Sequence, residues 1–168
     1  RVMVTSLTKA AALEAGGRDL GISHQNVGTL HHFAFDALDH PAIAEDAEGA
    51  KSWNEYIGPL APDLRLSRMG GSSLDEPRNS EVPDLVTNGD LCLSALNLSR
   101  ARCVPPELRP AHAARFEQYW TAWKRETDRM DFADLIDFAA DEPCPIEARA
   151  LFVDEAQDTN AVQRALLK

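Results

Sequence analysis

The segment that most constrains the fold is Ala150–Asn160, in which four apolar residues lead directly into an acidic turn. The run Ala-Leu-Phe-Val is short, apolar and bounded by polar residues, which is typical of a fully buried strand in a parallel sheet. Ligands of open parallel sheets bind just beyond the carboxyl ends of the strands. We therefore expect Asp154 and Glu155 at such a strand end, where one acid can hold Mg²⁺ and the next can polarise a water molecule.

A bare Asp-Glu pair after a strand is more often a solvated acidic turn. The longer string Val-Asp-Glu-Ala-Gln-Asp-Thr-Asn, with Gln163 three residues on, resembles motif II (Walker B) of UvrD/Rep-like superfamily 1 DNA helicases, whose signature is Asp-Glu-x-Gln-Asp. The resemblance implies that Asp154 holds Mg²⁺ and that Glu155, in contact with the metal through water, activates the attacking water. It also implies that Gln157 and Asp158 couple the γ-phosphate site of ATP to the DNA-facing motifs.

A second motif follows an apparent strand at residues 1–5. Thr8 is the expected N-cap of an Ala-rich helix that ends at Gly16-Gly17. The string Thr-Ser-Leu-Thr-Lys-Ala-Ala from Thr5 resembles motif Ia of these helicases, usually Thr-Phe-Thr-Asn-Lys-Ala-Ala, although Leu7 and Thr8 depart from it. The resemblance implies contacts to single-stranded DNA from Thr5, Thr8 and Lys9. The alternative is a capped helix with a solvated lysine.

A third motif lies at Gly28-Thr29-Leu30-His31. Thr29 is placed to cap a helix whose apolar residues recur at helical spacing, namely Leu30, Phe33, Ala34, Ala37 and Leu38. The Gly-Thr-x-His string resembles motif Ib, which implies single-stranded DNA contacts from Gly28, Thr29 and His31. His32 has no counterpart in that motif, and the nearby phenylalanines are expected in the core.

The alternation of strands and helices stops between residues 40 and 128. Two helix faces are expected there, one formed by Ile43, Ala47, Ala50, Trp53 and Ile57 and the other by Leu91, Ala95 and Leu98. The stretch Ser67–Pro83 is expected to be an exposed loop. In these helicases a helical 1B subdomain is inserted between motifs Ib and II, so the resemblance implies the same for residues 40–128.

A helix from Ala113 to about Arg129 carries four aromatic residues on one face: Phe116, Tyr119, Trp120 and Trp123. Four basic residues surround them: Arg115, Lys124, Arg125 and Arg129. Aromatic and basic residues together can form a stacking platform for single-stranded DNA. The spacing favours a simpler interpretation, an amphipathic core helix with a solvated basic side.

The alternation of strands and helices returns at residues Met130–Asp137. They are expected to begin a helix with Phe132, Leu135, Ile136 and Ala139 facing inward. A similar Asp-Phe-x-Asp-Leu element precedes motif II in these helicases. We expect its acids on a solvated face and assign them no catalytic role. The turn at residues 141–147 leads into the strand before Asp154, and Val162 and Leu166 begin a further amphipathic helix.

Composition narrows the function classes. The net charge of −10 argues against a general nucleic-acid binder, and only residues 100–129 carry a net positive charge, of +3. The three cysteines, Cys92, Cys103 and Cys144, fit neither a zinc spacing nor a disulfide framework. This cysteine pattern leads us to expect a protein of the reducing cytoplasm. No apolar run is long enough to span a membrane, and the N-terminus has no signal-peptide pattern.

The expected fold is an α/β, RecA-like P-loop NTPase motor-domain fragment with an inserted α-helical subdomain. The motor domain (1A) is expected at residues 1–39 and 129–168, and the insertion at residues 40–128. The chain contains no Gly-Lys pair and therefore no Walker A loop, which in this family precedes motif Ia. The chain is thus expected to need the remainder of the motor, including that strand and a second RecA-like domain.

The resemblance implies part of an ATP-dependent DNA helicase or translocase of 3′→5′ polarity, with ATP and Mg²⁺ as cofactors. Its partners would be single-stranded DNA and duplex junctions. Two alternatives stay open. One is a module that binds single-stranded DNA or protein and has lost the ATPase. The other is part of a helicase–nuclease.

Overall fold

The computed structural model describes residues 2–6, 8–17, 21–67, 86–141 and 148–167. The chain divides into two compact units. The α/β unit comprises residues 1–41 and 134–168, and the helical unit comprises residues 42–133. The sequence-based boundaries between the corresponding segments lay after residue 39 and after residue 128.

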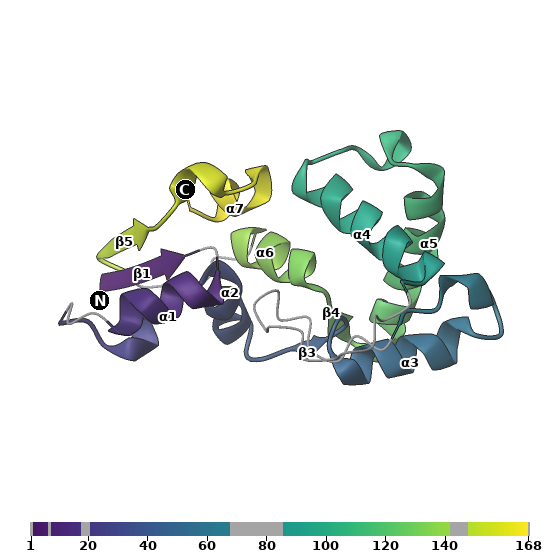
Figure 1. Cartoon of the computed structure of the whole chain (residues 1–168), viewed down its shortest axis with the longest axis horizontal. Coiled ribbons are helices and arrows are strands. Elements are labelled where there is room, and N and C mark those ends of the chain that lie inside the picture. The colour runs from purple at the N-terminus through teal and green to yellow at the C-terminus, as the bar shows by residue number, and fades with distance from the viewer. Residues whose placement is uncertain (1, 7, 18–20, 68–85, 142–147, 168) are drawn as a thin grey trace. The chain divides into compact units, whose positions relative to one another are not determined.

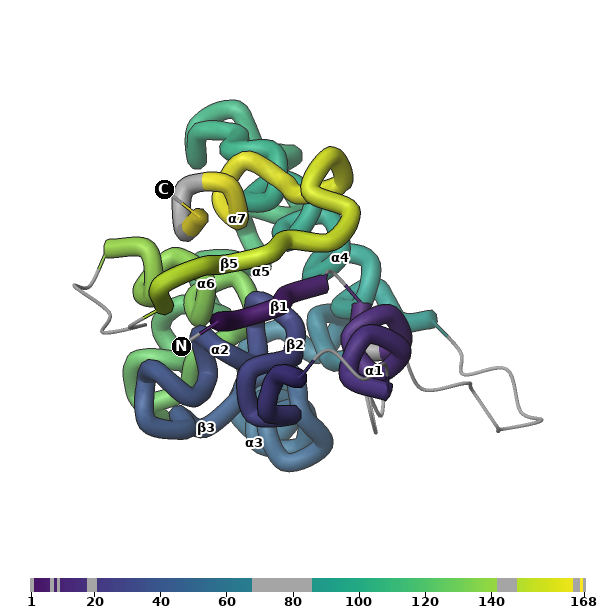
Figure 2. Tube along the Cα trace, turned by 90° about the vertical axis from the view of Figure 1, so that its left-hand side faces the viewer, coloured from purple at the N-terminus to yellow at the C-terminus, as the bar shows by residue number. Residues whose placement is uncertain are grey.

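The α/β unit contains a parallel sheet of three strands in the order β2-β1-β5 (Figures 1 and 2). The strands are β1 (Val2–Ser6), β2 (Val27–Thr29) and β5 (Ala150–Val153). The α/β class and the parallel sheet agree with the sequence-based prediction. Strand β2 was not predicted, because three residues with a central glycine give no usable alternation of polar and apolar residues.

Helices join or follow these strands. Helix α1 (Lys9–Gly17) follows β1, α2 (Leu30–Ala37) follows β2 and α7 (Ala161–Leu166) follows β5. The predicted apolar side of α2 is confirmed, because Leu30, Phe33 and Ala34 are buried.

Strand β5 differs from its prediction. Its parallel pairing with β1 is as expected, but its burial is not: Leu151 is 41% exposed and Phe152 is 61% exposed. Among the described residues β5 borders only β1, so it is an edge strand of this sheet. The prediction of a fully buried strand is therefore wrong for these residues, although the strand itself is correct.

The helical unit is framed by a pair of two-residue parallel strands, β3 (Ala42–Ile43) and β4 (Arg129–Met130). Between them run α3 (Ala47–Ile57), α4 (Asn88–Ala101) and α5 (Ala111–Thr127). The chain enters the unit at β3 and leaves it after β4. The pairing of these two strands therefore holds the entering and leaving segments side by side.

The core of the helical unit is aromatic. Trp53 of α3 and Phe116, Trp120 and Trp123 of α5 are each no more than 1% exposed. The ring of Trp53 lies 5.0 Å from that of Trp120 and 5.5 Å from that of Trp123, both edge to face. The interpretation of the aromatic face of α5 as core is therefore confirmed.

Three details of the helical predictions are wrong. Ile43 belongs to β3 and not to the helix that contains Trp53, and Ala47 at the start of that helix is exposed. On α4 the predicted inward residues Leu91 and Leu98 are 58% and 50% exposed, whereas the helix buries Cys92, Leu93, Leu96 and Ser99. Apolar residues lie on several sides of α4, so spacing alone could not select the buried face. The loops predicted at residues 67–83 and 141–147 fall almost wholly outside the described residues.

Asp131 is fully buried, at 0% exposure, so its prediction as part of a solvated acidic face is wrong. Its carboxylate accepts hydrogen bonds from Arg100 at 2.9 Å, from Lys124 Nζ at 2.6 Å and from Trp120 Nε1 at 2.9 Å. Lys124, predicted on a solvated basic side, is likewise buried. The two cations compensate the carboxylate, which is how a buried charge is tolerated.

Helix α6 (Phe132–Asp141) begins at the end of the helical unit and continues into the second part of the α/β unit. Leu135, Ile136 and Ala139 are buried, as predicted from their spacing, and Phe132 is half-buried. No helix in the described part of the chain is long and apolar enough to cross a membrane.

Candidate functional site

The carboxyl ends of the three parallel strands meet at one edge of the sheet. Ser6 at the end of β1 pairs with Thr29 at the end of β2, and Thr5 pairs with Val153 at the end of β5. The backbone N–H of Asp154 donates to the carbonyl oxygen of Thr5 at 2.8 Å. The three predicted motifs therefore share the edge at which open parallel sheets bind ligands.

Helix α1 starts at this edge directly after β1. The side-chain oxygen of Thr8 accepts a hydrogen bond from the backbone N–H of Ala11 at 3.2 Å, which confirms its predicted role as N-cap. Thr8 is exposed. Lys9 is the first residue of α1, and its side chain lies outside the described part of the structure. The predicted DNA contacts of both residues stay predictions.

Helix α2 starts at the same edge after β2. Thr29 accepts a hydrogen bond from the backbone N–H of His32 at 3.2 Å, so it is the N-cap that the sequence predicted. Gly28 is buried, and a Cβ atom there would lie only 2.6 Å from Cδ2 of His32. A side chain at residue 28 would displace that ring, which gives this glycine a packing reason independent of any ligand.

His31 follows the cap of α2, and burial lowers the pKa of its imidazole. The side chain is therefore held toward its neutral form, which can donate at one ring nitrogen and accept at the other. His32 lies 3.5 Å from Asp36, and His40 lies 3.2 Å from the same carboxylate. Both contacts are on the exposed surface, so they contribute little to stability.

The acidic turn after β5 is tightly folded. Glu155 has a left-handed backbone conformation, with φ of 54°, which is uncommon for a residue other than glycine. The side-chain amide of Gln157 donates to Oε2 of Glu155, and the backbone N–H of Asp158 donates to the carbonyl oxygen of Glu155 at 2.9 Å. Asp154, Glu155, Gln157 and Asp158 are all exposed at this edge.

Three residues at the end of the motif string complete the turn, and their structural roles were not predicted. The buried hydroxyl of Thr159 donates to the carbonyl oxygen of Ala156 at 2.7 Å. Asn160 and Gln163 exchange hydrogen bonds, each side chain accepting from the backbone N–H of the other, at 2.9 and 3.0 Å. This reciprocal arrangement opens α7, and the Asn-x-x-Gln spacing was the available signal for it.

Thr5 is at this edge but is fully buried, at 0% exposure. Its hydroxyl has no hydrogen-bond partner among the described residues. Its carbonyl oxygen is occupied by Asp154. In this conformation the Thr5 side chain faces the interior, whereas the exposed groups on neighbouring segments are Thr8 and the acidic turn.

The donor chemistry of the turn suits Mg²⁺, because carboxylate oxygens are its preferred protein ligands and it is commonly held by only one or two of them. Asp154 and Glu155 offer such oxygens at the strand end. No group of three or more His, Cys, Asp or Glu side chains that could hold a metal is present in the described ranges. These two carboxylates therefore fit a magnesium ion shared with water and phosphate, and the described residues offer no ligand set that would enclose an ion.

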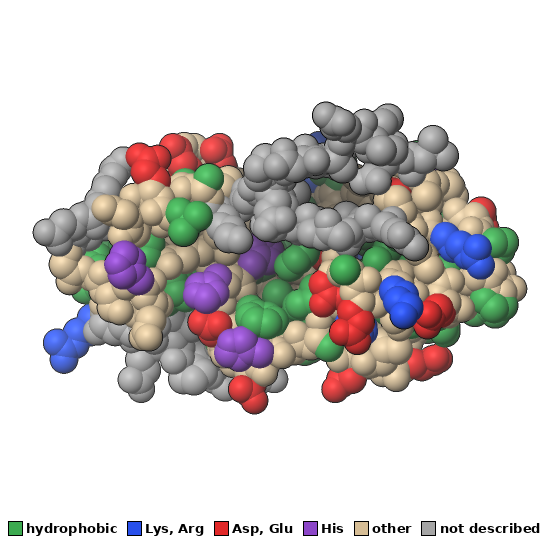
Figure 3. All heavy atoms as spheres, turned by 60° about the horizontal axis from the view of Figure 1, so that its bottom comes forward, with side chains coloured by type: hydrophobic (Ala, Val, Ile, Leu, Met, Phe, Trp, Pro, Cys, Tyr) green, Lys and Arg blue, Asp and Glu red, His purple; other side chains and the backbone are tan. Residues whose placement is uncertain are grey.

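In the view of Figure 3 the Lys and Arg side chains of the described residues lie apart from one another, most of them beside acidic side chains, and form no continuous basic patch on that face. Two of the arginines also form ion pairs within the helical unit: Arg109 pairs with Glu117, and Arg115 pairs with Asp63 at 2.7 Å.

Comparison of the chain with family models, with curated proteins and with solved structures found no match.

Proposed function

We propose that this chain is part of the first motor domain of an ATP-driven DNA helicase or translocase of the UvrD/Rep-like kind. The observation that carries the proposal is the acidic turn of β5 fastened to the end of β1, with the capped starts of α1 and α2 on neighbouring strands. The string Asp-Glu-Ala-Gln-Asp and its position at a strand end support the same proposal.

In the proposed motor, Asp154 holds Mg²⁺, which neutralises charge on the ATP phosphates when it is bound. Glu155 orients and deprotonates the attacking water. Its carboxylate is suited to this role because it lies beyond the end of β5 and is exposed to solvent. The contact from Gln157 restrains that carboxylate and so orients it. The Walker A loop would come from residues outside this sequence.

The same edge would carry the DNA contacts. Exposed N–H groups at helix starts attract phosphate, and the starts of α1 and α2 lie beside each other because their strands are paired. Thr8, Lys9, Thr29 and His31 are the residues proposed for this contact. DNA binding would therefore be local, because the net charge of −10 gives no general attraction to nucleic acid.

ATP hydrolysis by the natural protein that carries this chain tests the proposal. We expect Glu155→Gln to retain ATP binding and to lower the turnover rate by about 10²-fold or more, the scale of a lost general base. Asp39→Asn is a matched control, because Asp39 is an exposed acid in the same unit and asparagine tolerates its left-handed backbone. Equal turnover in wild type and Glu155→Gln would exclude the proposed catalytic role.

The alternative is a module that binds single-stranded DNA without using nucleotide. It predicts no ATP hydrolysis in either variant and DNA affinity that does not change when ATP is added. The proposed motor predicts hydrolysis that single-stranded DNA accelerates. The two functions are thus separated by one assay, performed with and without DNA.

A further inference from the structure

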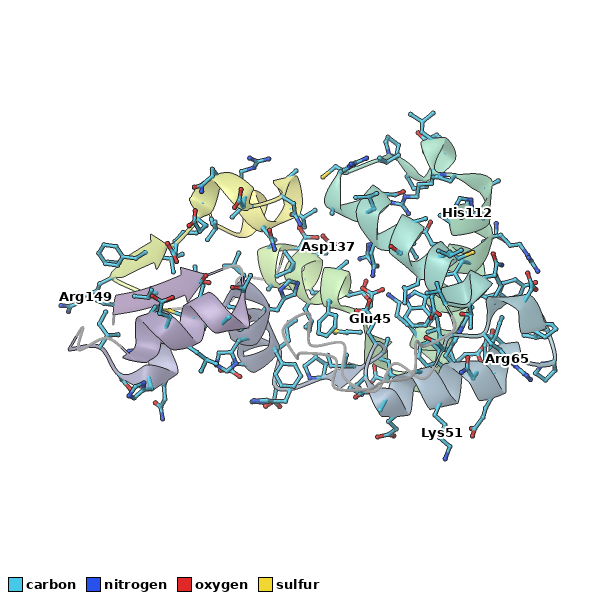
Figure 4. All side chains as sticks on the ribbon, viewed as in Figure 1. Glu45, Lys51, Arg65, His112, Asp137 and Arg149 are labelled. Atoms are coloured by element: carbon cyan, nitrogen blue, oxygen red, sulfur yellow. The ribbon has the colours of Figure 1, made fainter. Side chains whose placement is uncertain are left out.

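Glu45 lies between β3 and α3 and is buried, with 6% of its surface exposed. Glutamate is almost never buried to this extent unless a partner compensates its charge. In Figure 4 its side chain points among the helices of the helical unit, whereas Lys51 of α3 points away from them.

Both carboxylate oxygens of Glu45 accept hydrogen bonds from distant parts of the chain. Oε2 accepts from the backbone N–H of Phe132 at 2.8 Å, and Oε1 accepts from Nδ2 of Asn97 at 2.9 Å. Phe132 is the first residue of α6, where the backbone N–H has no partner within the helix. Glu45 thus joins the start of α6 to α4 and fastens the point at which the chain leaves the helical unit.

The charges around Glu45 are unevenly distributed. Arg100 of α4 and Lys124 of α5 both bind the carboxylate of Asp131, which lies between β4 and α6. Glu45 itself receives hydrogen bonds from neutral groups.

The charged residues that come next after Glu45 in the chain are acids and cannot compensate it either. Asp46 and Glu48 at the start of α3 are both paired with Arg129, at 3.8 and 3.0 Å. Arg100 and Lys124 thus bind the carboxylate of Asp131, whereas the hydrogen-bond donors to Glu45 are neutral.

Burial among neutral hydrogen-bond donors disfavours the charged form of Glu45. Burial, followed by the repulsion from Asp131, raises the pKa of the Glu45 carboxyl, although the hydrogen bonds from Phe132 and Asn97 and the charge of Lys124 act in the opposite direction. The folded helical unit therefore binds a proton at Glu45 more tightly than the unfolded chain does.

Asn97 is suited to both protonation states of Glu45. While its Nδ2 donates to the carboxylate, its Oδ1 is buried without a hydrogen-bond partner among the described residues. Rotating the amide by half a turn exchanges these atoms with almost no change of shape. Oδ1 then accepts from the O–H of a protonated Glu45, and one amide atom is unpaired in either orientation.

We propose that Glu45 is a proton-operated latch at the junction where the chain enters and leaves the helical unit. Uptake of one proton by its carboxylate removes the repulsion from Asp131, and the Asn97 amide turns to accept the new O–H. The latch stabilises the helical unit most when Glu45 is neutral. This stabilisation is complete below the ordinary pKa of glutamate and declines as the pH rises through the higher pKa of the folded state.

An NMR titration of the isotopically labelled chain tests the latch. The side-chain carboxyl carbon of Glu45 and the backbone amide of Phe132 should change chemical shift together, with one midpoint above 4.5, the ordinary value for this group. In Glu45→Gln the transition at Phe132 should disappear. In the control Glu48→Gln it should remain, because Glu48 is exposed and paired with Arg129.

A Glu45 midpoint at or below 4.5 would overturn the proposal, as would a Phe132 transition that survives in Glu45→Gln. Urea unfolding between pH 5 and pH 8 gives a second readout. Wild type should lose stability relative to Glu45→Gln as the pH rises, whereas parallel curves would contradict the latch. If Glu45→Gln fails to fold, the titration of Glu45 in wild type still decides the outcome.

Discussion

Nζ of Lys124 lies 2.6 Å from Oδ2 of Asp131, and both side chains are withdrawn from solvent in the core of the helical unit. Arg100 holds the same carboxylate from α4. One acid therefore joins α4, α5 and the segment before α6. Forming such a buried cluster contributes little net stability, whereas removing one of its members is costly because buried charge then loses compensation.

Asp131→Asn should accordingly lower the free energy of unfolding by about 3–5 kcal/mol, since Arg100 and Lys124 lose the buried carboxylate that both bind. Urea unfolding followed by tryptophan fluorescence measures this directly. Asp63→Asn is the control: it breaks an ion pair with Arg115 in which both side chains are about half exposed, and it should change stability little. Equal changes in the free energy of unfolding would show that the buried cluster contributes no more to stability than an exposed ion pair.

The tryptophans of α5 give a second prediction. Because Trp120 and Trp123 are buried against Trp53, single-stranded DNA should not quench the tryptophan emission of the chain. Saturable quenching by DNA would instead support the stacking-platform interpretation, which the burial of these rings argues against.

The same aromatic core predicts a loss of stability on truncation. Phe116→Ala should cost about 3–5 kcal/mol of stability, as truncation of a buried aromatic ring does.

These predictions also show what the sequence could and could not reveal. Spacing placed the aromatic residues of α5 correctly in a core, because one helix face carried almost all the large side chains. It failed for α4, where apolar residues lie on several sides and Leu91 and Leu98 are exposed. It also failed for Asp131, because the partners of a buried acid are distant in the chain and leave no local pattern.

The candidate site was predicted in part for similar reasons. The strand at Ala150–Val153 and the caps Thr8 and Thr29 are local features, and all three are present. The short strand β2 and the burial of Thr5 depend on pairing between distant segments, which no local pattern encodes. The exposure of Phe152 depends on which neighbours the sheet has, and this too is not a local property.

Thr5 provides a further prediction. Its buried hydroxyl has no partner among the described residues, so Thr5→Val should leave stability unchanged or raise it by about 1 kcal/mol. Thr159→Val is the matched comparison, because the hydroxyl of Thr159, which is also buried, donates to the carbonyl oxygen of Ala156, and its loss should cost about 1 kcal/mol. A clear loss of stability in Thr5→Val would mean that the hydroxyl is hydrogen-bonded in solution.

His31 predicts a pH dependence of the opposite sign to that of Glu45. Burial lowers the pKa of His31, so the folded α/β unit favours the neutral imidazole. The resulting stabilisation is present above the unfolded pKa of about 6.5 and is lost as the pH falls through the lower pKa of the folded state. Wild type should therefore lose more stability than His31→Gln between pH 7.5 and pH 5, measured by urea unfolding at each pH. Identical losses would exclude this contribution.

The most direct test of the proposed motor is directional movement along single-stranded DNA by the natural protein that carries this chain. In stopped-flow experiments with ATP, the delay before the protein reaches a fluorophore at the 5′ end should lengthen in proportion to the length of the oligonucleotide. When the fluorophore is at the 3′ end, the signal should not depend on the length of the oligonucleotide. Glu155→Gln should abolish the movement. A signal independent of length at both ends, despite DNA binding, would contradict the assignment of this chain to a DNA motor.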